Sequence, residues 1–354
     1  MQRLRVQQVT TAALAIVVSG FSLAACSSSG SGGSGGSSGP SGTLNASGSS
    51  FQLLFQQAAI QQFRTIQPNV TVNYGGGGSG KGRSDLAAGT VNFAGSDSPI
   101  PSTETANFAG KTVLYFPVVI GPITMSYNLP GVTSLKLTPT VIADIFQAKI
   151  KTWNDPAIKA INPGVTLPST HITLAVRADS SGTTQNFSLF LMTAAPSVWK
   201  LGSSSTISWP SGAQAGSGNG GVAQIVHATP GAIGYVDYAD AKAAGLTFAS
   251  VQNKAGQYIV PSTTAASAAA AGVTVAPDLT FAAVWAPGAT AYPITYQSWD
   301  LVYQKQSSAS TAKALKAYLG YLLGAGQKLL PALNYAPLPA SIDAKAKAQL
   351  SKIG

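Results

Sequence analysis

A regular alternation of short apolar strands and helical segments constrains the fold of this chain most strongly. Residues 51–66 carry apolar side chains at helical spacing, residues 70–74 alternate apolar and polar side chains, and 91–94 form another short strand after a short helix. Helices and strands also alternate in the middle of the chain. There the sequence predicts helices at 140–146, 184–192 and 221–228, and strands at 172–177 and 232–236. Strands that alternate with helices build a mostly parallel sheet, so the sequence predicts an α/β fold with a partly parallel sheet.

Three further segments complete the prediction of the elements. Residues 114–125 are apolar but contain Pro117 and Pro122, so they indicate buried strands rather than a membrane span. Residues 262–272 are small and of low complexity, and we expect a loop there. Residues 312–323 and 341–353 are predicted to be helices.

Composition excludes several classes of protein. The 354 residues suggest two domains at roughly 150 residues each. One Cys excludes a disulfide framework, and two His leave little room for a zinc site. Glu104 is the single Glu, which excludes a Glu-based acid/base pair. We therefore expect neither a metal nor a cofactor.

The N-terminus indicates export. Arg3 and Arg5 precede a short apolar stretch that is below the roughly 20 residues needed to cross a bilayer, and Leu23-Ala24-Ala25-Cys26 follows. This box resembles the lipobox of bacterial lipoproteins, in which Cys26 would be acylated after cleavage of residues 1–25. Residues 27–42 are almost all Ser and Gly, a tether with a root-mean-square reach of about 20–24 Å. An ordinary signal peptide is the alternative.

A glycine-rich loop at residues 75–82 follows a predicted strand. Its glycines partly match a P-loop and a dinucleotide fingerprint, but Gly82 stands where a P-loop needs Ser or Thr, and the following helix is very short. What remains is a turn into a helix, whose backbone N–H groups suit an anion. A purely structural loop is the alternative.

Two other helix starts carry the same chemistry. Residues 177–183 lead from a strand into a helix and offer the guanidinium of Arg177, which Asp179 can orient, together with Ser and Thr hydroxyls. Ser49 and Ser50 precede the helix at 51–66, where either hydroxyl can cap it. The three helix starts could converge on one anion, although a capped helix with a surface ion pair also explains residues 177–183.

Two rival functions receive little support. A secreted serine hydrolase would need a Ser in a G-x-S-x-G elbow between a strand and a helix, followed by Asp and His, and the sequence places no Ser in such a context. We expect His171 and His227 to be structural. The five Trp residues are scattered and the positive charge is dispersed Lys, so we expect no nucleic acid as a partner.

Over almost all of residues 44–354, the chain resembles the phosphate-binding protein of the bacterial high-affinity phosphate ABC transporter. The resemblance rests on five segments in the same order: 45–51, 91–99, 150–155, 177–183 and 230–236. It implies a two-lobed periplasmic-binding-protein-like fold of type II, with a ligand cleft between the lobes.

The resemblance also implies a phosphate site. Ser50, the backbone of Phe51, and Ser79 would donate from one lobe, where Asp97 would accept a proton from phosphate. The remaining residues would complete the cage from the other lobe: Arg177, Ser181, Gly182 and Thr183. Ser50 replaces a familiar Thr and keeps the hydroxyl, whereas Lys81 replaces a small residue and either adds charge or points to solvent.

From the resemblance we expect one lobe at residues 44–119 plus 295–354 and the other at 120–294, after a signal peptide (1–25) and a lipidated tether (26–43). The expected function is capture of inorganic phosphate by lobe closure and delivery to the permease subunits of an ABC transporter, with no bond made or broken. We expect a monomer, lipid-anchored to the outer face of the cell membrane. A binding protein for sulfate or molybdate is the alternative that Asp97 disfavours, because a buried carboxylate opposes an anion without a proton.

Overall fold

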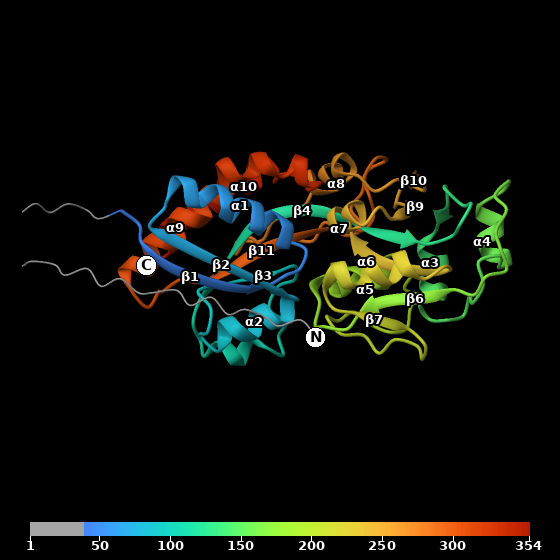
Figure 1. The fold of residues 1–354 in the computed structure, drawn as a ribbon, viewed down its shortest axis with the longest axis horizontal. Coiled ribbons are helices and arrows are strands. Elements are labelled where there is room, and N and C mark those ends of the chain that lie inside the picture. The colour runs from blue at the N-terminus through green and yellow to red at the C-terminus, as the bar shows by residue number, and fades with distance from the viewer. Residues whose placement is uncertain (1–38) are drawn as a thin grey trace, which may run out of the picture. The chain divides into compact units, whose positions relative to one another are not determined.

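One long sheet runs through residues 39–354, the part of the chain that the computed structural model describes (Figure 1). The predicted signal peptide, Cys26 and residues 27–38 of the predicted tether lie outside these residues. The main path of the sheet is β2-β1-β3-β11-β4-β8-β6-β7. The pairs β1–β2, β1–β3, β6–β8 and β6–β7 are parallel, and β11–β3, β11–β4 and β4–β8 are antiparallel. The predicted α/β class with a partly parallel sheet is confirmed.

The strands have the following bounds: β1 Gly42–Gly48, β2 Val70–Gly77, β3 Phe93–Ser96, β4 Val113–Tyr127, β5 Lys136–Leu137, β6 Thr173–Arg177, β7 Gln214–Gly216, β8 Ala232–Asp237, β9 Thr247–Gln252, β10 Tyr258–Ile259 and β11 Thr295–Tyr303.

The α-helices have the following bounds: α1 Leu53–Ile66, α2 Ser79–Ala87, α3 Pro139–Phe146, α4 Pro156–Ile161, α5 Gly182–Ala194, α6 Gly218–Ala228, α7 Tyr238–Ala243, α8 Thr263–Ala270, α9 Ala309–Leu323 and α10 Ala340–Gln349. Short 3₁₀ turns lie at Thr105–Phe108, Ala325–Leu329, Pro331–Leu333 and Leu350–Lys352.

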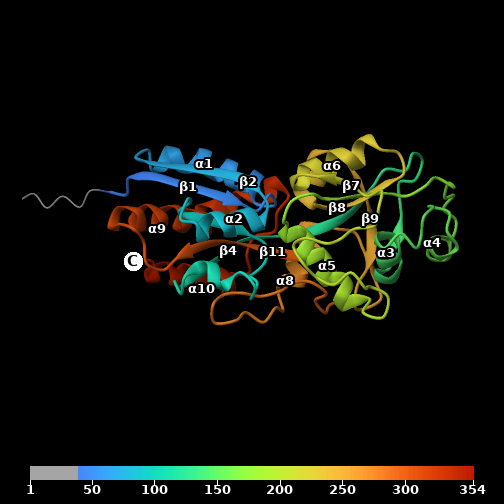
Figure 2. The ribbon, with the colours of Figure 1, turned by 90° about the horizontal axis from the view of Figure 1, so that it is seen from below.

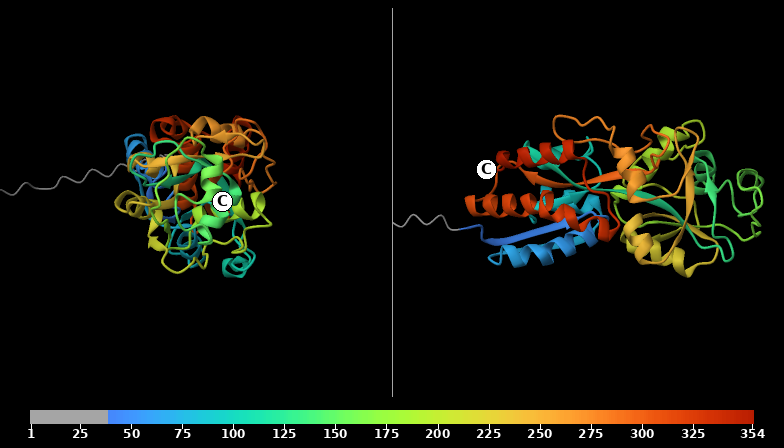
Figure 3. Two further views of the ribbon diagram at one scale, coloured as in Figure 1. Left: turned by 90° about the vertical axis from the view of Figure 1, so that its right-hand side faces the viewer. Right: turned by 90° about the horizontal axis from the view of Figure 1, so that it is seen from above.

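Strand β4 connects two lobes of this α/β fold. Its residues Val113–Pro122 pair with β11, and from Ile123 onward it pairs with β8 instead. One lobe holds β1, β2, β3 and β11, and the other holds β6, β7 and β8, as Figures 2 and 3 show from other sides. The two-lobed fold is therefore confirmed, whereas lobe boundaries near Val119 and Thr295 stay a prediction.

The predicted strands in 114–125 form a single strand despite two prolines. Proline cannot donate to a sheet ladder and is tolerated at a bulge. The register of β4 shifts next to Pro117, between the partners of Ser298 and Trp299, which places the proline at such an irregularity.

One prediction, a loop at residues 262–272, is wrong. The segment contains α8, and the Ser262 hydroxyl accepts a hydrogen bond of 3.1 Å from the amide of Ala265 at its start. Alanine has the highest helix propensity, so a run of small residues rich in Ala favours a helix once it is capped. Four alanines of α8 are buried.

The start of α1 also differs from the prediction. The helix begins at Leu53 rather than Phe51, and neither Ser49 nor Ser50 acts as its N-cap residue. The Ser49 hydroxyl still accepts a weak hydrogen bond of 3.4 Å from the Gln52 amide. The Ser49 hydroxyl donates to Asp97, and the Ser50 hydroxyl accepts from Asn219, so both side chains belong to the polar group described below.

The core is built from both faces of the sheet. Most buried apolar residues form one cluster, which includes Trp153 and Trp299, and a smaller cluster lies around Val222 and Val236. Figure 1 shows α1 on one side of β1–β3 and α2 on the other, while α9 packs against β1 and α10 against β4. No helix within residues 39–354 is long and apolar enough to cross a membrane.

Candidate functional site

Asp97 follows β3 directly and lies at the centre of a group of buried polar residues. It is 2% exposed. Its Oδ1 accepts hydrogen bonds of 2.5 Å from the hydroxyls of Ser49 and Ser298, and its Oδ2 accepts one of 3.3 Å from Ser79. Its backbone carbonyl accepts a hydrogen bond of 2.7 Å from the Asn186 side chain. The carboxyl group is thus held in one orientation by residues from distant parts of the chain.

The surroundings of Asp97 act on its charge in opposite directions. Burial raises the pKa of Asp97, while the hydrogen bonds from Ser298 and Ser49 and the charge of Arg177 lower it. The net pKa is raised above the ordinary value of an Asp. A carboxylate that is still stabilised by hydroxyl donors is suited to accept a proton from a ligand.

Arg177 ends β6 and is also buried. Its guanidinium donates to both carboxylate oxygens of Asp179, from Nε at 2.9 Å and from Nη2, and its Nη1 donates to the Thr183 hydroxyl at 3.3 Å. Burial alone would raise the pKa of Asp179, but the Arg177 guanidinium holds it below its ordinary value. The predicted pairing of Arg177 with Asp179 is confirmed.

Helix α5 begins at the next three predicted residues. The Ser181 hydroxyl caps it by accepting a hydrogen bond of 3.2 Å from the Thr184 amide. Gly182 packs directly against the other lobe, because a Cβ there would lie 2.4 Å from Ser79 Oγ and 2.7 Å from Asp97 Oδ2. The first residue of α5 therefore contacts both Ser79, at the start of α2, and the side chain of Asp97.

Ser50 meets the other lobe through a residue that the sequence analysis did not select. Its hydroxyl accepts hydrogen bonds of 3.2 Å from both the backbone and the side-chain nitrogen of Asn219, the second residue of α6. The same side-chain nitrogen donates to the Thr183 hydroxyl at 3.2 Å. Asn219 thereby joins the starts of α1, α5 and α6.

The side chain of Phe51 is anchored in the core. Its ring stacks on Tyr296 at 4.1 Å between centroids, and its carbonyl accepts a hydrogen bond of 2.7 Å from the Tyr335 hydroxyl. The Tyr296 hydroxyl is buried without a hydrogen-bond partner among residues 39–354. Burial and the nearby carboxylates of Asp237 and Asp97 raise its pKa, so it stays a neutral donor.

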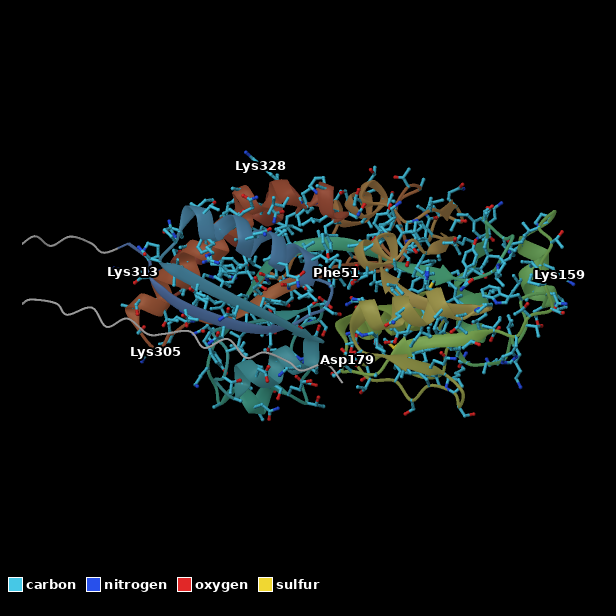
Figure 4. All side chains as sticks on the ribbon, viewed as in Figure 1. Phe51, Lys159, Asp179, Lys305, Lys313 and Lys328 are labelled. Carbon is cyan, nitrogen blue, oxygen red and sulfur yellow. The ribbon has the colours of Figure 1, made fainter. Side chains whose placement is uncertain are left out.

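Four helix N-termini, those of α1, α2, α5 and α6, meet at one place. Figure 4 labels Phe51 and Asp179, which mark the two lobes where they face each other. The N-terminal end of a helix carries partial positive charge and unpaired N–H groups. Together with Arg177, these ends favour an anion.

The structure brings the eight predicted site residues together and leaves Lys81 out. Lys81 pairs with Asp85 at 2.7 Å, and its side chain is 53% exposed. All eight are buried: Ser50, Phe51, Ser79, Asp97, Arg177, Ser181, Gly182 and Thr183. Within residues 39–354, the imidazoles of His171 and His227 make no hydrogen bond with any serine, and no metal-binding group of His, Cys, Asp or Glu is present.

Sequence reasoning missed four polar residues of the site: Asn186, Asn219, Tyr296 and Ser298. For Ser49 the sequence predicts only a helix cap, whereas its hydroxyl donates to Asp97 Oδ1. A signal existed for Asn219, since Ser217 and the glycines around it resemble the other helix starts. No local pattern marks Ser298, which reaches Asp97 from 201 residues further along the chain.

The family model described as PBP superfamily domain matches residues 33–325. The phosphate-binding protein PstS of Pasteurella multocida is 36% identical over 313 residues, which cover 87% of this chain and 89% of that protein. The phosphate-binding protein PstS 3 of Mycobacterium leprae is 33% identical over 356 residues, with 94% and 96% covered.

Solved structures share the fold. The periplasmic phosphate-binding protein PfluDING, solved with phosphate, superposes with a TM-score of 0.72 at 22% identity, and covers 87% of this chain and 93% of its own. A phosphate-binding protein from Stenotrophomonas maltophilia gives 0.71 at 20% identity, with 87% and 94% covered. The family match and the extent of the curated relatives lead to one conclusion: the chain belongs to the PBP superfamily and, within it, to the family of phosphate-binding proteins.

Proposed function

We propose that this protein binds inorganic phosphate between its two lobes, outside the cytoplasm, and delivers it to the permease of an ABC transporter. One observation carries the proposal: donors from four helix starts and the guanidinium of Arg177 form a buried cage around the carboxyl group of Asp97. Relatives that match nearly the whole chain are named phosphate-binding proteins.

The mixture of donors and one acceptor favours phosphate over other oxyanions. A buried cleft requires every donor and acceptor to be matched. Hydroxyls, backbone N–H groups and the guanidinium donate to the oxygens of an anion, whereas ionised Asp97 can only accept. Phosphate near neutral pH supplies a hydroxyl hydrogen for Asp97. Sulfate and molybdate have no proton to donate, so one of their oxygens would lie against a carboxylate oxygen of Asp97 with no hydrogen bond between them.

Each predicted residue has a role in this proposal. Ser50, Ser79, Ser181 and Thr183 donate hydroxyl groups, and the backbone N–H groups of Phe51 and Gly182 donate from helix starts. Arg177 supplies the positive charge, which Asp179 holds in place. The lobes close over the anion and release it again, so no bond is made or broken and no catalytic residue is required.

Export and anchoring complete the proposal. The leader at residues 1–25 and the box that ends at Cys26 support a mature protein held by lipid on the outer face of the cell membrane. We propose that it works there as a monomer, with the permease subunits as its protein partners.

Calorimetric titration of the purified protein with phosphate, sulfate, molybdate and arsenate tests the function. We expect phosphate to bind far more tightly than sulfate. Arg177→Ala should weaken phosphate binding about tenfold or more, because a hydrogen bond to a charged group contributes roughly 1.5–3 kcal/mol. Arg64→Ala, which removes an exposed arginine on α1, is the control. Unchanged phosphate affinity in Arg177→Ala would refute the role of Arg177, and absent phosphate binding in wild type would refute the function.

A further inference from the structure

A chain of buried side chains runs from the core under α1 to Asp97. The Tyr318 hydroxyl donates to Gln56 Oε1 at 2.6 Å, Gln56 Nε2 donates to Gln52 Oε1 at 2.9 Å, and Gln52 Nε2 donates to Ser298 Oγ at 2.7 Å. Ser298 then donates to Asp97 Oδ1. The four side chains before Asp97 are fully buried, so water does not compete for these hydrogen bonds.

The direction of the hydrogen bonds is fixed by a backbone group. Gln52 Nε2 also lies 2.9 Å from the carbonyl oxygen of Trp299, which can only accept. The amide of Gln52 therefore presents its nitrogen to Ser298, and Ser298 must place its own hydrogen elsewhere. Of the two acceptors within reach, Asp97 Oδ1 at 2.5 Å is nearer than the Ser96 carbonyl at 3.3 Å.

The two oxygens of Asp97 consequently differ. Oδ1 receives two hydroxyl donors, from Ser298 and Ser49, which use both of its lone pairs. Oδ2 has one long contact of 3.3 Å to Ser79 and faces Gly182 at the start of α5. Oδ2 is thus the oxygen of Asp97 that can still accept a hydrogen bond from a ligand near Ser79 and Gly182.

We propose that the relay Tyr318–Gln56–Gln52–Ser298 sets the anion selectivity of the site, by saturating Asp97 Oδ1 with donors and leaving Oδ2 to accept the ligand's proton. This inference rests on the proposed phosphate function. Ser298 and Gln52 are positioning residues here, since they act on the ligand through Asp97.

The pH dependence of sulfate binding measures how strongly the relay stabilises the ionised form of Asp97. Sulfate carries no proton in the range from about pH 4 to pH 7, so it binds only when Asp97 is protonated and can donate. Arg177, Tyr74, Tyr296 and Tyr335 are the other ionisable groups whose charges couple to Asp97. A guanidinium is charged throughout this range, and burial raises the pKa of all three tyrosines, so none of these four groups changes charge. Burial also raises the pKa of the Asp237 carboxyl group, which acts on Tyr296. Asp237 makes its hydrogen bonds with Asn219 and Asp240 rather than with the relay, so its titration should be the same in wild type and in the variants.

The experiment measures sulfate and phosphate affinity by calorimetry across this pH range in wild type and three variants. Ser298→Ala removes one donor to the ionised carboxylate, so the onset of sulfate binding should move to higher pH by roughly one to two units. Gln52→Met keeps a side chain of similar length but removes the donor that orients Ser298, and should cause a smaller shift in the same direction. Ser126→Ala, which removes a buried hydroxyl bonded to Thr124, is the matched control and should leave the onset unchanged.

The outcomes separate the inference from the function. If wild type binds phosphate in preference to sulfate but Ser298→Ala or Gln52→Met gives the wild-type onset, the relay does not set selectivity. If wild type does not bind phosphate at all, the proposed function itself fails. Melting temperatures close to that of Ser126→Ala would show that the variants are folded.

Discussion

Among single residues, the buried carboxyl group of Asp300 should make the stability of the protein depend on pH. Asp300 lies in β11 beneath α1, and burial raises its pKa to about 8 although Gln56 donates to both of its oxygens. The folded protein therefore keeps a proton that the unfolded chain loses near its ordinary pKa of 3.8. The contribution of this group to stability is complete below about pH 4 and is lost as the pH rises to about 8.

We expect Asp300→Asn to flatten this dependence. The amide is uncharged at every pH and keeps an oxygen for Gln56, so the variant should gain stability over wild type as the pH rises from about 4 to 8. Thermal melts across this range measure the difference, and Asp278→Asn, at an exposed position, is the control. Parallel melting curves for Asp300→Asn and wild type would contradict the protonated state of Asp300.

The sequence could reveal only part of the site at this scale. Residues at the turn from a strand into a helix share a local pattern of Gly, Ser and Thr, which is why Ser79 and residues 181–183 could be selected. Ser298 and Asn186 reach Asp97 from other strands and helices, and their contacts depend on the pairing of β11 with β3 and on the docking of α5. Such contacts are long-range in the chain and leave no local signal.

For whole elements, the packing of α5 against α2 depends on the missing side chain of Gly182. A methyl group there would meet Ser79 Oγ and Asp97 Oδ2 at less than 3.0 Å. We expect Gly182→Ala to push α5 away from the start of α2 and to weaken phosphate binding about tenfold or more, because overpacking costs roughly 1–3 kcal/mol. The helix itself should tolerate Ala, which has a higher helix propensity than Gly.

Gly220→Ala on α6 provides the matched control for Gly182→Ala. Gly220 is exposed, and a Cβ there would lie 3.8 Å from the nearest atom, Asp240 Oδ1. This variant should bind phosphate as wild type does and gain up to about 1 kcal/mol in stability. Calorimetry measures the phosphate affinity of each variant, and thermal melts measure its stability. Equal affinity in Gly182→Ala and wild type would mean that the closed contact with α2 is not needed for binding.

Helices were more predictable than strands, for physical reasons. An amphipathic helix such as α9 repeats its apolar face over several turns, so its existence is visible in the sequence. Strand β1 lies where the Gly/Ser-rich segment ends, and the buried strand β11 mixes polar and aromatic residues, so neither carries a clear alternation. In α8 the prediction failed because the helix depends on alanine propensity and a serine cap rather than on periodic apolar residues.

For the molecule as a whole, the two lobes meet through a small set of polar contacts around the site. The Gly80 amide donates to the Ser180 carbonyl at 3.0 Å, and the side chains of Asn186 and Asn219 reach Asp97 and Ser50. A ligand that binds between the lobes adds to these contacts in the folded state alone. At a hundred times its dissociation constant it should stabilise the protein by about 2.7 kcal/mol. The resemblance to a family, rather than any periodicity, predicted this two-lobed arrangement, because lobe docking is a property of the complete chain.

Cys26 is the residue through which we expect the molecule to be anchored to the membrane. Cys26 ends the box Leu23-Ala24-Ala25-Cys26 and precedes a segment of Ser and Gly, which together favour a lipid anchor on a tether. Cys26→Ser removes the thiol that would be acylated, so the protein should be released into the medium or left uncleaved. Membrane fractionation and mass spectrometry measure both, with Ser28→Ala as the control. Phosphate affinity of the released protein should equal that of wild type, because every residue of the proposed cage lies at position 49 or later. A fully processed Cys26→Ser protein that stays with the membrane would refute the lipid anchor.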